Sequence, residues 1–194
     1  MREDKVVKDI MASIKEYNTI NEDDHLCLAL LILKDNYEKI AAGTEEKLHK
    51  TLVVTGTAGK IVGKLSIFDI LRGLVPEAAK HPVSMRAFYN SLSSRVLEAM
   101  HETDEINERF EWLHNRFSDL VKKECAKQVK SVMSPIHPVL HEDDPINKAI
   151  YVMFRENIRQ PMVVREGKIV GIVNIMDILP VLLTIADTDI KGSA

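Results

Sequence analysis

The 194-residue sequence is poor in several residue types that mark whole classes of protein. It has two cysteines, Cys27 and Cys125, which provide neither a disulfide framework nor the spacing of a zinc site. We therefore expect free thiols in a reducing compartment. Aromatic residues make up 5% of the chain, and its only tryptophan, Trp112, lies beside an apolar helical stripe. That position favours packing over stacking on a base.

The sequence also lacks a long apolar run and a block of basic residues. The run at 178–186 is far shorter than the roughly 20 residues that a membrane-spanning helix needs, and the first residues contain no apolar signal core. The 26 Lys and Arg residues are interspersed with 29 Asp and Glu residues, so no nucleic-acid footprint is apparent. These features predict a cytoplasmic protein with neither a membrane nor a nucleic-acid partner.

Nothing in the sequence favours catalysis or metal binding. The seven histidines show no paired spacing typical of metal ligands, and no nucleophile elbow or phosphate-binding loop is present. Two acidic triplets, residues 22–24 and 142–144, stand just before expected helices, where helix capping explains them better than acid–base chemistry. We therefore expect no enzyme and no metal site.

One segment occurs twice. GKIVGKLSIFDIL (59–71) and GKIVGIVNIMDIL (167–179) match at an offset of 108. Other matches pair 7–11 with 129–133 at an offset of 122, 22–24 with 142–144 at 120, and 53–54 with 163–164 at 110. The falling offset places insertions in the first copy. The chain is therefore a tandem repeat, whose copies usually pack on each other.

Each copy shows the order helix, strand, helix, strand, strand, helix, which predicts an α/β (α+β) fold. In the second copy we expect Asp144 to cap a helix with Pro145 at its first position, and apolar spacing continues this helix to about residue 157. A hairpin over 161–173 and a closing helix over 175–183 follow. Asp24, a hairpin over 52–65 and a helix over 67–75 are their counterparts in the first copy.

Residues 76–127 separate the copies and have another character. Apolar residues from Met85 to Ala99, and from Ile106 to Leu120 with gaps of four and three, predict two amphipathic helices in a hairpin. The expected domains are therefore 1–75, 76–127 and 128–194. The hairpin could pack on its own chain or serve for dimerisation or docking, and the pattern does not choose between these alternatives.

The repeat order, the opening Val-Lys-x-[Ile/Val]-Met and the segment Ile-Val-Gly-x-[Leu/Val]-[Ser/Asn]-Ile-x-Asp-Ile-Leu resemble the CBS (cystathionine-β-synthase) domain. Two such domains in tandem resemble the Bateman module, a regulatory nucleotide sensor. The resemblance covers residues 5–75 and 128–184. It implies a pseudo-two-fold pair with two clefts for AMP, ADP, ATP or S-adenosylmethionine, no required cofactor, a homodimer and an unidentified regulated protein partner.

The resemblance also implies site residues. The ribose-phosphate motif of the family, Gly-x-x-[Ser/Thr]-x-x-Asp, is complete at Gly63, Ser66 and Asp69, whereas the second copy has Asn174 and Asp177. We expect the first cleft to be the stronger site, although a capped helix start needs the same residues. The resemblance further assigns phosphate contacts to His49, Lys50, Arg159 and Gln160, and adenine contacts to Thr19, Ile20, Thr51, Leu52, Val139, Leu140, Pro161 and Met162.

A different reading of the same sequence is a ligand-free scaffold. In that case the repeats are structural units and the helical hairpin is the working surface. The substitution of Asn174 for a hydroxyl residue and the mildly acidic charge balance are compatible with this alternative.

Overall fold

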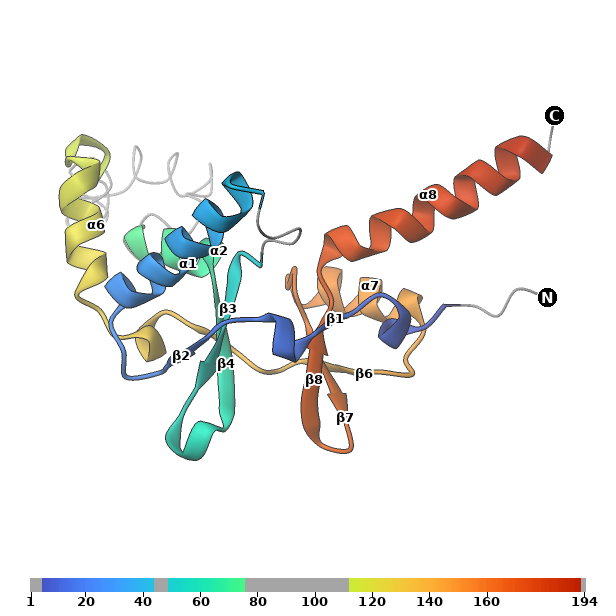
Figure 1. Cartoon of the computed structure of the whole chain (residues 1–194), viewed down its shortest axis with the longest axis horizontal. Helices are drawn as coiled ribbons and strands as arrows, with labels where there is room; N and C mark the ends of the chain where they lie inside the picture. Colours follow the sequence, from blue (N-terminus) through green and yellow to red (C-terminus); the bar gives the residue numbers. More distant parts are fainter. Residues whose placement is uncertain (1–4, 44–48, 76–111, 193–194) are drawn as a thin grey trace, which may run out of the picture.

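The computed structural model describes residues 5–43, 49–75 and 112–192, with side chains described up to residue 187. Within these ranges the chain forms two four-stranded sheets that stand side by side, with the longer helices above them (Figure 1). This arrangement confirms the predicted fold class of mixed helices and strands. Most of the predicted helical hairpin, residues 76–111, lies outside the described residues.

The first sheet has the strand order β2-β3-β4-β5. Its centre is the antiparallel hairpin of β3 and β4, and β2 runs parallel to β3. Among the described residues, the α-helices α1, α2 and α6 belong to this half, and α6 leads into the second copy. The elements are β2 (Thr19–Asn21), α1 (Leu26–Ala41), β3 (Thr51–Thr55), η3 (Thr57–Gly59), β4 (Ile61–Ser66), α2 (Ile67–Leu74), α6 (Phe117–Cys125), η4 (Val129–Ser131) and β5 (Ser134–Pro135). The short helix η2 (Ile14–Glu16) precedes β2 and contacts β8 of the second sheet.

The second sheet has the strand order β1-β8-β7-β6 and the same pairing pattern. A hairpin of β7 and β8 forms its centre, and β6 runs parallel to β7. Its elements are η1 (Val7–Asp9), β1 (Ala12–Ser13), β6 (Val139–His141), α7 (Ile146–Arg155), β7 (Met162–Arg165), β8 (Lys168–Ile172) and α8 (Ile175–Gly192).

The two copies exchange their leading segments. Strand β1, from the start of the chain, pairs with β8, and β5, from the start of the second copy, pairs with β4. Val7 is fully buried in the hydrophobic core of the second half, and its counterpart Val129 is fully buried in the core of the first. Figure 1 shows the chain crossing between the halves accordingly. Neither copy therefore completes its sheet or its core alone.

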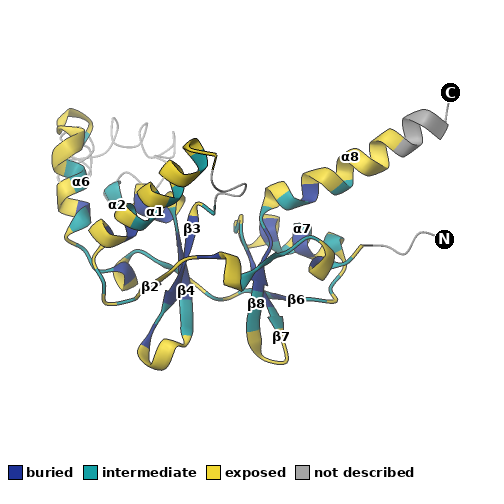
Figure 2. Ribbon diagram, in the orientation of Figure 1, coloured by how far each residue is buried: buried dark blue, intermediate teal, exposed yellow. Residues whose placement is uncertain are grey.

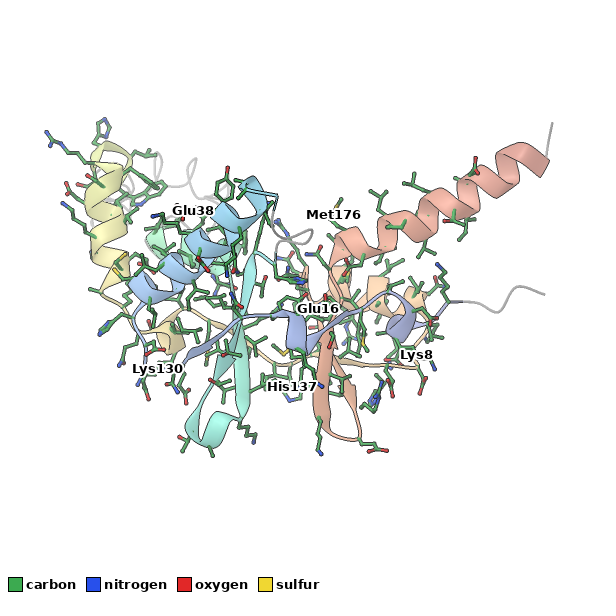
Figure 3. All side chains as sticks on the ribbon, in the orientation of Figure 1. Lys8, Glu16, Glu38, Lys130, His137 and Met176 are labelled. Carbon is green, nitrogen blue, oxygen red and sulfur yellow. The ribbon has the colours of Figure 1, made fainter. Side chains whose placement is uncertain are left out.

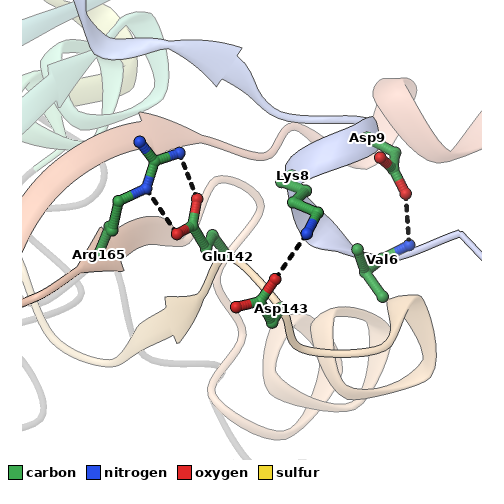
Figure 4. Close-up of polar contacts among 6 residues, drawn as sticks. All are labelled: Val6, Lys8, Asp9, Glu142, Asp143 and Arg165. Atoms are coloured by element: carbon green, nitrogen blue, oxygen red, sulfur yellow. Dashed lines mark hydrogen bonds and ion pairs between the residues drawn. The ribbon is translucent and has the colours of Figure 1, made fainter.

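The acidic triplets receive these exchanged segments. The Val7 N–H donates to the Asp144 carbonyl (2.9 Å), and Lys8 forms an ion pair with Asp143 (2.8 Å; Figure 4). On the other side, Lys130 forms an ion pair with Asp23 (2.8 Å). The expected helix caps are wrong in detail, because the Asp144 carboxylate accepts the N–H of His141 rather than one from α7.

Three apolar clusters hold the structure together. One lies between the first sheet and its helices, and one lies in the corresponding place in the second half. The third joins the two sheets through Tyr17, Val53, Met162 and Ile172, all buried. Figure 2 shows this buried centre along the adjacent faces of the hairpins, with exposed residues on the outer helices and at the hairpin tips.

Two helices differ from their predicted lengths. The closing helix α8 continues through Pro180 to Gly192 instead of ending near 183, and its end extends away from the sheets (Figure 1). The predicted helix over 106–120 does not run through its last part, because α6 begins at Phe117 after an extended residue, Arg116. Leu113 and Phe117 from its apolar stripe are exposed on the described structure.

Candidate functional site

The first candidate site is the N-terminus of α2, where Ser66 and Asp69 form a capping box. The Ser66 N–H and hydroxyl both donate to Asp69 Oδ2 (2.8 and 2.6 Å), and the Asp69 N–H donates to Ser66 Oγ (3.2 Å). The hydroxyl of Ser134, on the exchanged strand β5, donates to Asp69 Oδ1 (2.6 Å). Asp69 is only 4% exposed. The structure thus shows both carboxylate oxygens engaged within the chain.

A buried lysine lies beside this carboxylate. Lys64 of β4 is 7% exposed, and its ammonium donates a short hydrogen bond to the backbone carbonyl of Gln160. Burial lowers the pKa of Lys64 to about 8, although the negative charge of Asp69 opposes this shift. A positive charge therefore sits between the two halves, close to the start of α2.

Residues of the second copy face the start of α2. The Arg159 guanidinium lies over the Phe68 ring, 4.8 Å from its centroid. The hydroxyl of buried Thr51 donates to Gln160 Oε1 (2.7 Å). The structure therefore brings together Ser66, Asp69, Thr51, Arg159 and Gln160, all of which were predicted as site residues.

The second candidate site is the N-terminus of α8. The Asn174 side chain accepts the Met176 N–H (2.9 Å), and the Asn174 N–H donates to Asp177 Oδ2 (2.7 Å). Asn174 therefore replaces serine as the helix cap, as the sequence suggested. Asp177 is partly exposed, in contrast to the buried Asp69.

Residues of the first copy face the start of α8. Tyr17 is buried, and this burial together with the charge of Asp177 raises the pKa of its phenol above the usual range. The Tyr17 ring contacts the His49 ring at 4.0 Å between centroids, and His49 Nε2 lies 3.5 Å from Glu16 Oε2. Figure 3 shows Glu16 and Met176 in the region where the two halves meet.

Strand register defines which residues correspond between the copies. Ile20 pairs with Val54 on β3, and Leu140 pairs with Val163 on β7, so the offset here is 109 and not 110. The Ile67 N–H donates to the Lys50 carbonyl and the Ile175 N–H to the Arg159 carbonyl, both at 3.2 Å. This register corrects the sequence alignment. Lys50 corresponds to Arg159, and Thr51 corresponds to its own hydrogen-bond partner, Gln160.

The predicted adenine contacts are mostly core residues. Ile20, Leu52, Leu140 and Met162 are at most 3% exposed. The first three belong to the clusters between a sheet and its helices, and Met162 belongs to the cluster between the two sheets. Of the other predicted adenine contacts, Val139 is partly buried and Thr19 is exposed. Pro161 is buried, and its carbonyl accepts the Val173 N–H (3.1 Å).

Sequence reasoning missed Lys64, Ser134, Tyr17 and Phe68. The sequence did contain a signal for Lys64. It is the charged residue of an otherwise uncharged strand, and the second copy has Ile172 at the same position. Ser134 gave no such signal, because its partner Asp69 is distant in the sequence and is reached only by strand exchange.

Among residues 5–43, 49–75 and 112–192, no group of three or more His, Cys, Asp or Glu side chains is arranged to hold a metal ion. No helix in the same part of the chain has the length and apolarity needed to cross a membrane.

Comparisons with known proteins place this fold. The family model described as CBS domain matches residues 129–184. A search of curated proteins finds no matching sequence. The chain is similar to the crystal structure of CBSX2 in complex with AMP, at 18% identity and a TM-score of 0.54, over 93% of this chain and 97% of that chain.

Two other solved structures show the same likeness. One is a CBS domain-containing protein of unknown function from Bacillus anthracis, at 20% identity and a TM-score of 0.53, over 93% of this chain and 94% of that one. The other is the CBS domain pair of protein MJ0100 in complex with 5′-methylthioadenosine and S-adenosyl-L-methionine, at 19% identity and a TM-score of 0.52, over 93% and 97%. The described fold is similar to that of these CBS-domain structures. The family model thus identifies residues 129–184 as similar to a CBS domain, and the solved structures show that the fold of both halves together is similar to that of CBS-domain proteins.

Proposed function

We propose that this protein senses an adenosine-containing ligand, such as AMP, ADP, ATP or S-adenosylmethionine, at the region between its two CBS domains. The observation that carries the proposal is the pair of helix N-termini at α2 and α8, each with an aspartate in the first turn and each facing side chains of the other copy. Helix N-termini favour phosphate, and a first-turn carboxylate can accept ribose hydroxyls. The AMP complex of CBSX2 supports this choice of ligand class.

The two helix starts are not equivalent, and we expect the one at α8 to bind more readily. Asp69 is buried, and a ribose would have to displace the Ser134 hydroxyl from Asp69 Oδ1. Asp177, in contrast, is partly exposed, so its carboxylate is more accessible to a ribose. This order reverses the expectation from the sequence motif alone.

A ligand bound at either helix start would contact both copies. Arg159 reaches α2 from the second copy, and Tyr17 lies near Asp177 from the first. Binding would therefore favour one arrangement of the two halves over others, which is how a ligand shifts a population of conformations. We propose that a regulated protein partner binds preferentially to one of these arrangements.

Isothermal titration of the full chain with each of the four ligands tests the proposal. We expect at least one to bind, and Asp177→Asn to weaken it at least tenfold while keeping an oxygen that can accept the Asn174 N–H. Asp35→Asn, an exposed change on α1, is the matched control and should bind as the wild type does. No heat and no rise in melting temperature with any ligand at millimolar concentration would contradict sensing.

The same variants test the order of the sites. Asp69→Asn should leave the tighter binding event unchanged if α8 is the preferred site. Loss of that event in Asp69→Asn, with Asp177→Asn unaffected, would return the preference to α2 and to the original motif.

We also propose that the protein is a homodimer joined through its outer helices. Large apolar side chains are exposed at matching positions of α2 and α8: Ile67 and Ile175, Phe68 and Met176, Leu71 and Leu179. A patch with internal two-fold symmetry suits an isologous contact with a second copy. Exposed apolar residues on α1 and α7 extend this patch.

Analytical ultracentrifugation tests the dimer. Leu71→Glu combined with Leu179→Glu should convert it to monomer, whereas Lys60→Glu at the opposite, hairpin end should not. A monomeric wild type at tens of micromolar would contradict the proposal. A dimer that survives the double change but is lost on deletion of 76–127 would favour the scaffold alternative, with the inserted segment as its contact.

A further inference from the structure

The two cysteines of the chain lie on two helices that meet. Cys27 is the second residue of α1, and Cys125 is the last residue of α6. The backbone beside them is paired in antiparallel fashion, because the Leu26 N–H donates to the Lys127 carbonyl (3.0 Å) and His25 forms a bridge with Gln128. The His25 ring nitrogen Nδ1 also lies 2.9 Å from the Ala126 carbonyl oxygen. These contacts hold the chain next to both cysteines in one register.

This register brings the two cysteines close together, and the Cys27 thiol influences the Cys125 thiol. Hydrogen bonding with Cys27 is the largest influence that raises the pKa of the Cys125 thiol to about 11, followed by burial. Cys27 is exposed, and Cys125 is partly buried. An oxidant in solution can therefore reach the pair through Cys27.

We propose that Cys27 and Cys125 form a reversible disulfide that fastens α6 to α1. A disulfide requires two Cβ atoms that lie close together, and the antiparallel pairing of the backbone segments that carry Cys27 and Cys125 brings the two residues near each other. The sequence alone predicted two free thiols, because 97 positions and an entire hairpin separate them and no spacing rule connects them.

The chemistry needs an oxidant, which we take to be a small-molecule disulfide such as oxidised glutathione. The Cys27 thiolate attacks one glutathione sulfur, which breaks the glutathione S–S bond and releases one glutathione thiolate. The Cys125 thiolate then attacks the Cys27 sulfur, forms the protein disulfide and releases the second glutathione thiolate. The two thiol protons pass to the two released thiolates. The protein loses two electrons, and the oxidant becomes two molecules of reduced glutathione.

The order of the steps follows from the structure. Cys27 is the more accessible thiol, whereas the raised pKa of Cys125 keeps that thiol protonated at neutral pH. Once Cys27 is in a mixed disulfide, its thiol no longer holds the Cys125 proton by hydrogen bonding. Cys125 is therefore the resolving residue.

The bond would tighten a contact between α6 and the helix that carries Ser66 and Asp69. The Lys127 ammonium donates to the Gly73 carbonyl at the end of α2 (3.3 Å) and pairs with buried Glu124 (2.5 Å). The Trp112 indole N–H donates to the Leu74 carbonyl (2.8 Å). Because α6 packs against α2 and the residues on both sides of α6 hydrogen-bond to the end of α2, a covalent bond from α6 to α1 would restrict the positions of the three helices relative to one another.

Equilibration of the full chain with reduced and oxidised glutathione, followed by rapid alkylation and mass spectrometry, tests this inference. We expect a monomeric product about 2 Da lighter than the reduced protein, with neither cysteine alkylated and a Cys27–Cys125 cross-linked peptide after digestion. Its melting temperature should exceed that of the reduced protein by several degrees, because the bond restricts the unfolded chain.

Single variants separate this disulfide from other oxidation products. Cys125→Ser should stop at the glutathione adduct on Cys27, and neither Cys125→Ser nor Cys27→Ser should gain melting temperature on oxidation. The wild-type measurement stands without them if a variant fails to fold. Two alkylatable thiols after equilibration in excess oxidised glutathione, a stable adduct on wild-type Cys27, or cross-links only between chains would overturn the proposal.

Discussion

Thr51 donates a 2.7 Å hydrogen bond to Gln160, the residue at its own position in the other copy. The pseudo-two-fold axis of the duplicated fold therefore passes close to this bond. Thr51 and Gln160 occupy the same position in the two copies but differ in residue type. The bond forms because the threonine hydroxyl donates and the glutamine side-chain carbonyl oxygen accepts. Divergence of the two copies has thus produced a specific polar contact at the centre of their interface.

Removal of this contact should weaken the junction of the copies. Thr51 is 1% exposed, so Thr51→Val keeps its shape and deletes the hydroxyl. We expect the free energy of unfolding to fall by about 1 kcal/mol, measured by urea denaturation. Gln160→Met should lower the free energy of unfolding much less in the Thr51→Val background than in the wild type. Additive effects of the two changes would show that the bond contributes nothing.

The repeated glycines of the hairpins should be intolerant of any side chain. A Cβ atom at Gly63 would lie 2.6 Å from the Ser134 carbonyl oxygen, and one at Gly171 would lie 2.7 Å from the Ala12 carbonyl oxygen. Both contacts are with the exchanged strands. Either change to alanine should therefore destabilise the fold by about 1–3 kcal/mol, because a backbone segment must shift.

The control for these changes lies at the tip of the β7–β8 hairpin, which also contains Gly171. Gly167 has a positive φ of 74°, and a Cβ atom there would meet nothing within 4 Å. Asparagine tolerates this conformation, so Gly167→Asn should leave the denaturation midpoint almost unchanged. If Gly63→Ala also leaves the denaturation midpoint almost unchanged, the backbone of the exchanged strand does not pack closely against Gly63.

The sequence was sufficient to predict the repeat, the order of helices and strands along each copy, and the fold class, because a duplicated hairpin and helix leave a strong pattern. It was insufficient for the strand exchange. Strands β1 and β5 have two residues each, too few to show any periodicity. The exchange in turn determines what surrounds Asp69, so the burial of this carboxylate by Ser134 could not be foreseen from the motif.

The helix starts that form the candidate site were predicted from the sequence, but the strand register around them was not. Ser66, Asp69, Asn174 and Asp177 stand at helix starts as expected. The one-residue difference in strand register, however, decides that Arg159 corresponds to Lys50 and not to His49. A sequence with insertions between the matched blocks does not determine that register, whereas paired backbone atoms do.

Removal of the Ser134 hydroxyl should cost stability and expose the first site. Ser134→Ala makes β5 resemble β1, which has Ala12 at this position, and deprives Asp69 Oδ1 of its 2.6 Å donor. Asp69 is buried, and a buried charged group that loses a hydrogen-bond partner destabilises a fold more than a neutral group does. We therefore expect the free energy of unfolding to fall by about 1–3 kcal/mol. Ser131→Ala, at an exposed serine of η4, is the control. Equal stability of the Ser134→Ala variant and the wild type would show that water replaces the donor.

The buried Lys64 should make stability depend on pH. Its pKa is about 8 in the folded protein and near 10.5 in the unfolded chain, so between these values the unfolded chain binds more protons. The free energy of unfolding therefore rises as the pH increases from about 8 toward 10.5, by at most about 3 kcal/mol for this group. Tyr17, with its raised pKa, acts in the opposite direction above pH 10.

Urea denaturation of Lys64→Met and the wild type between pH 7 and pH 9.5 isolates this effect below the range of Tyr17. The variant also loses the hydrogen bond to the Gln160 carbonyl, which shifts its stability by a pH-independent amount. The difference in the free energy of unfolding, wild type minus variant, should therefore increase steadily above pH 8, whereas Lys168→Met on the exposed end of β8 should run parallel to the wild type. Parallel curves for Lys64→Met as well would mean that the lysine keeps its ordinary pKa, because its ammonium would then be equally protonated in the folded and unfolded chains across this range.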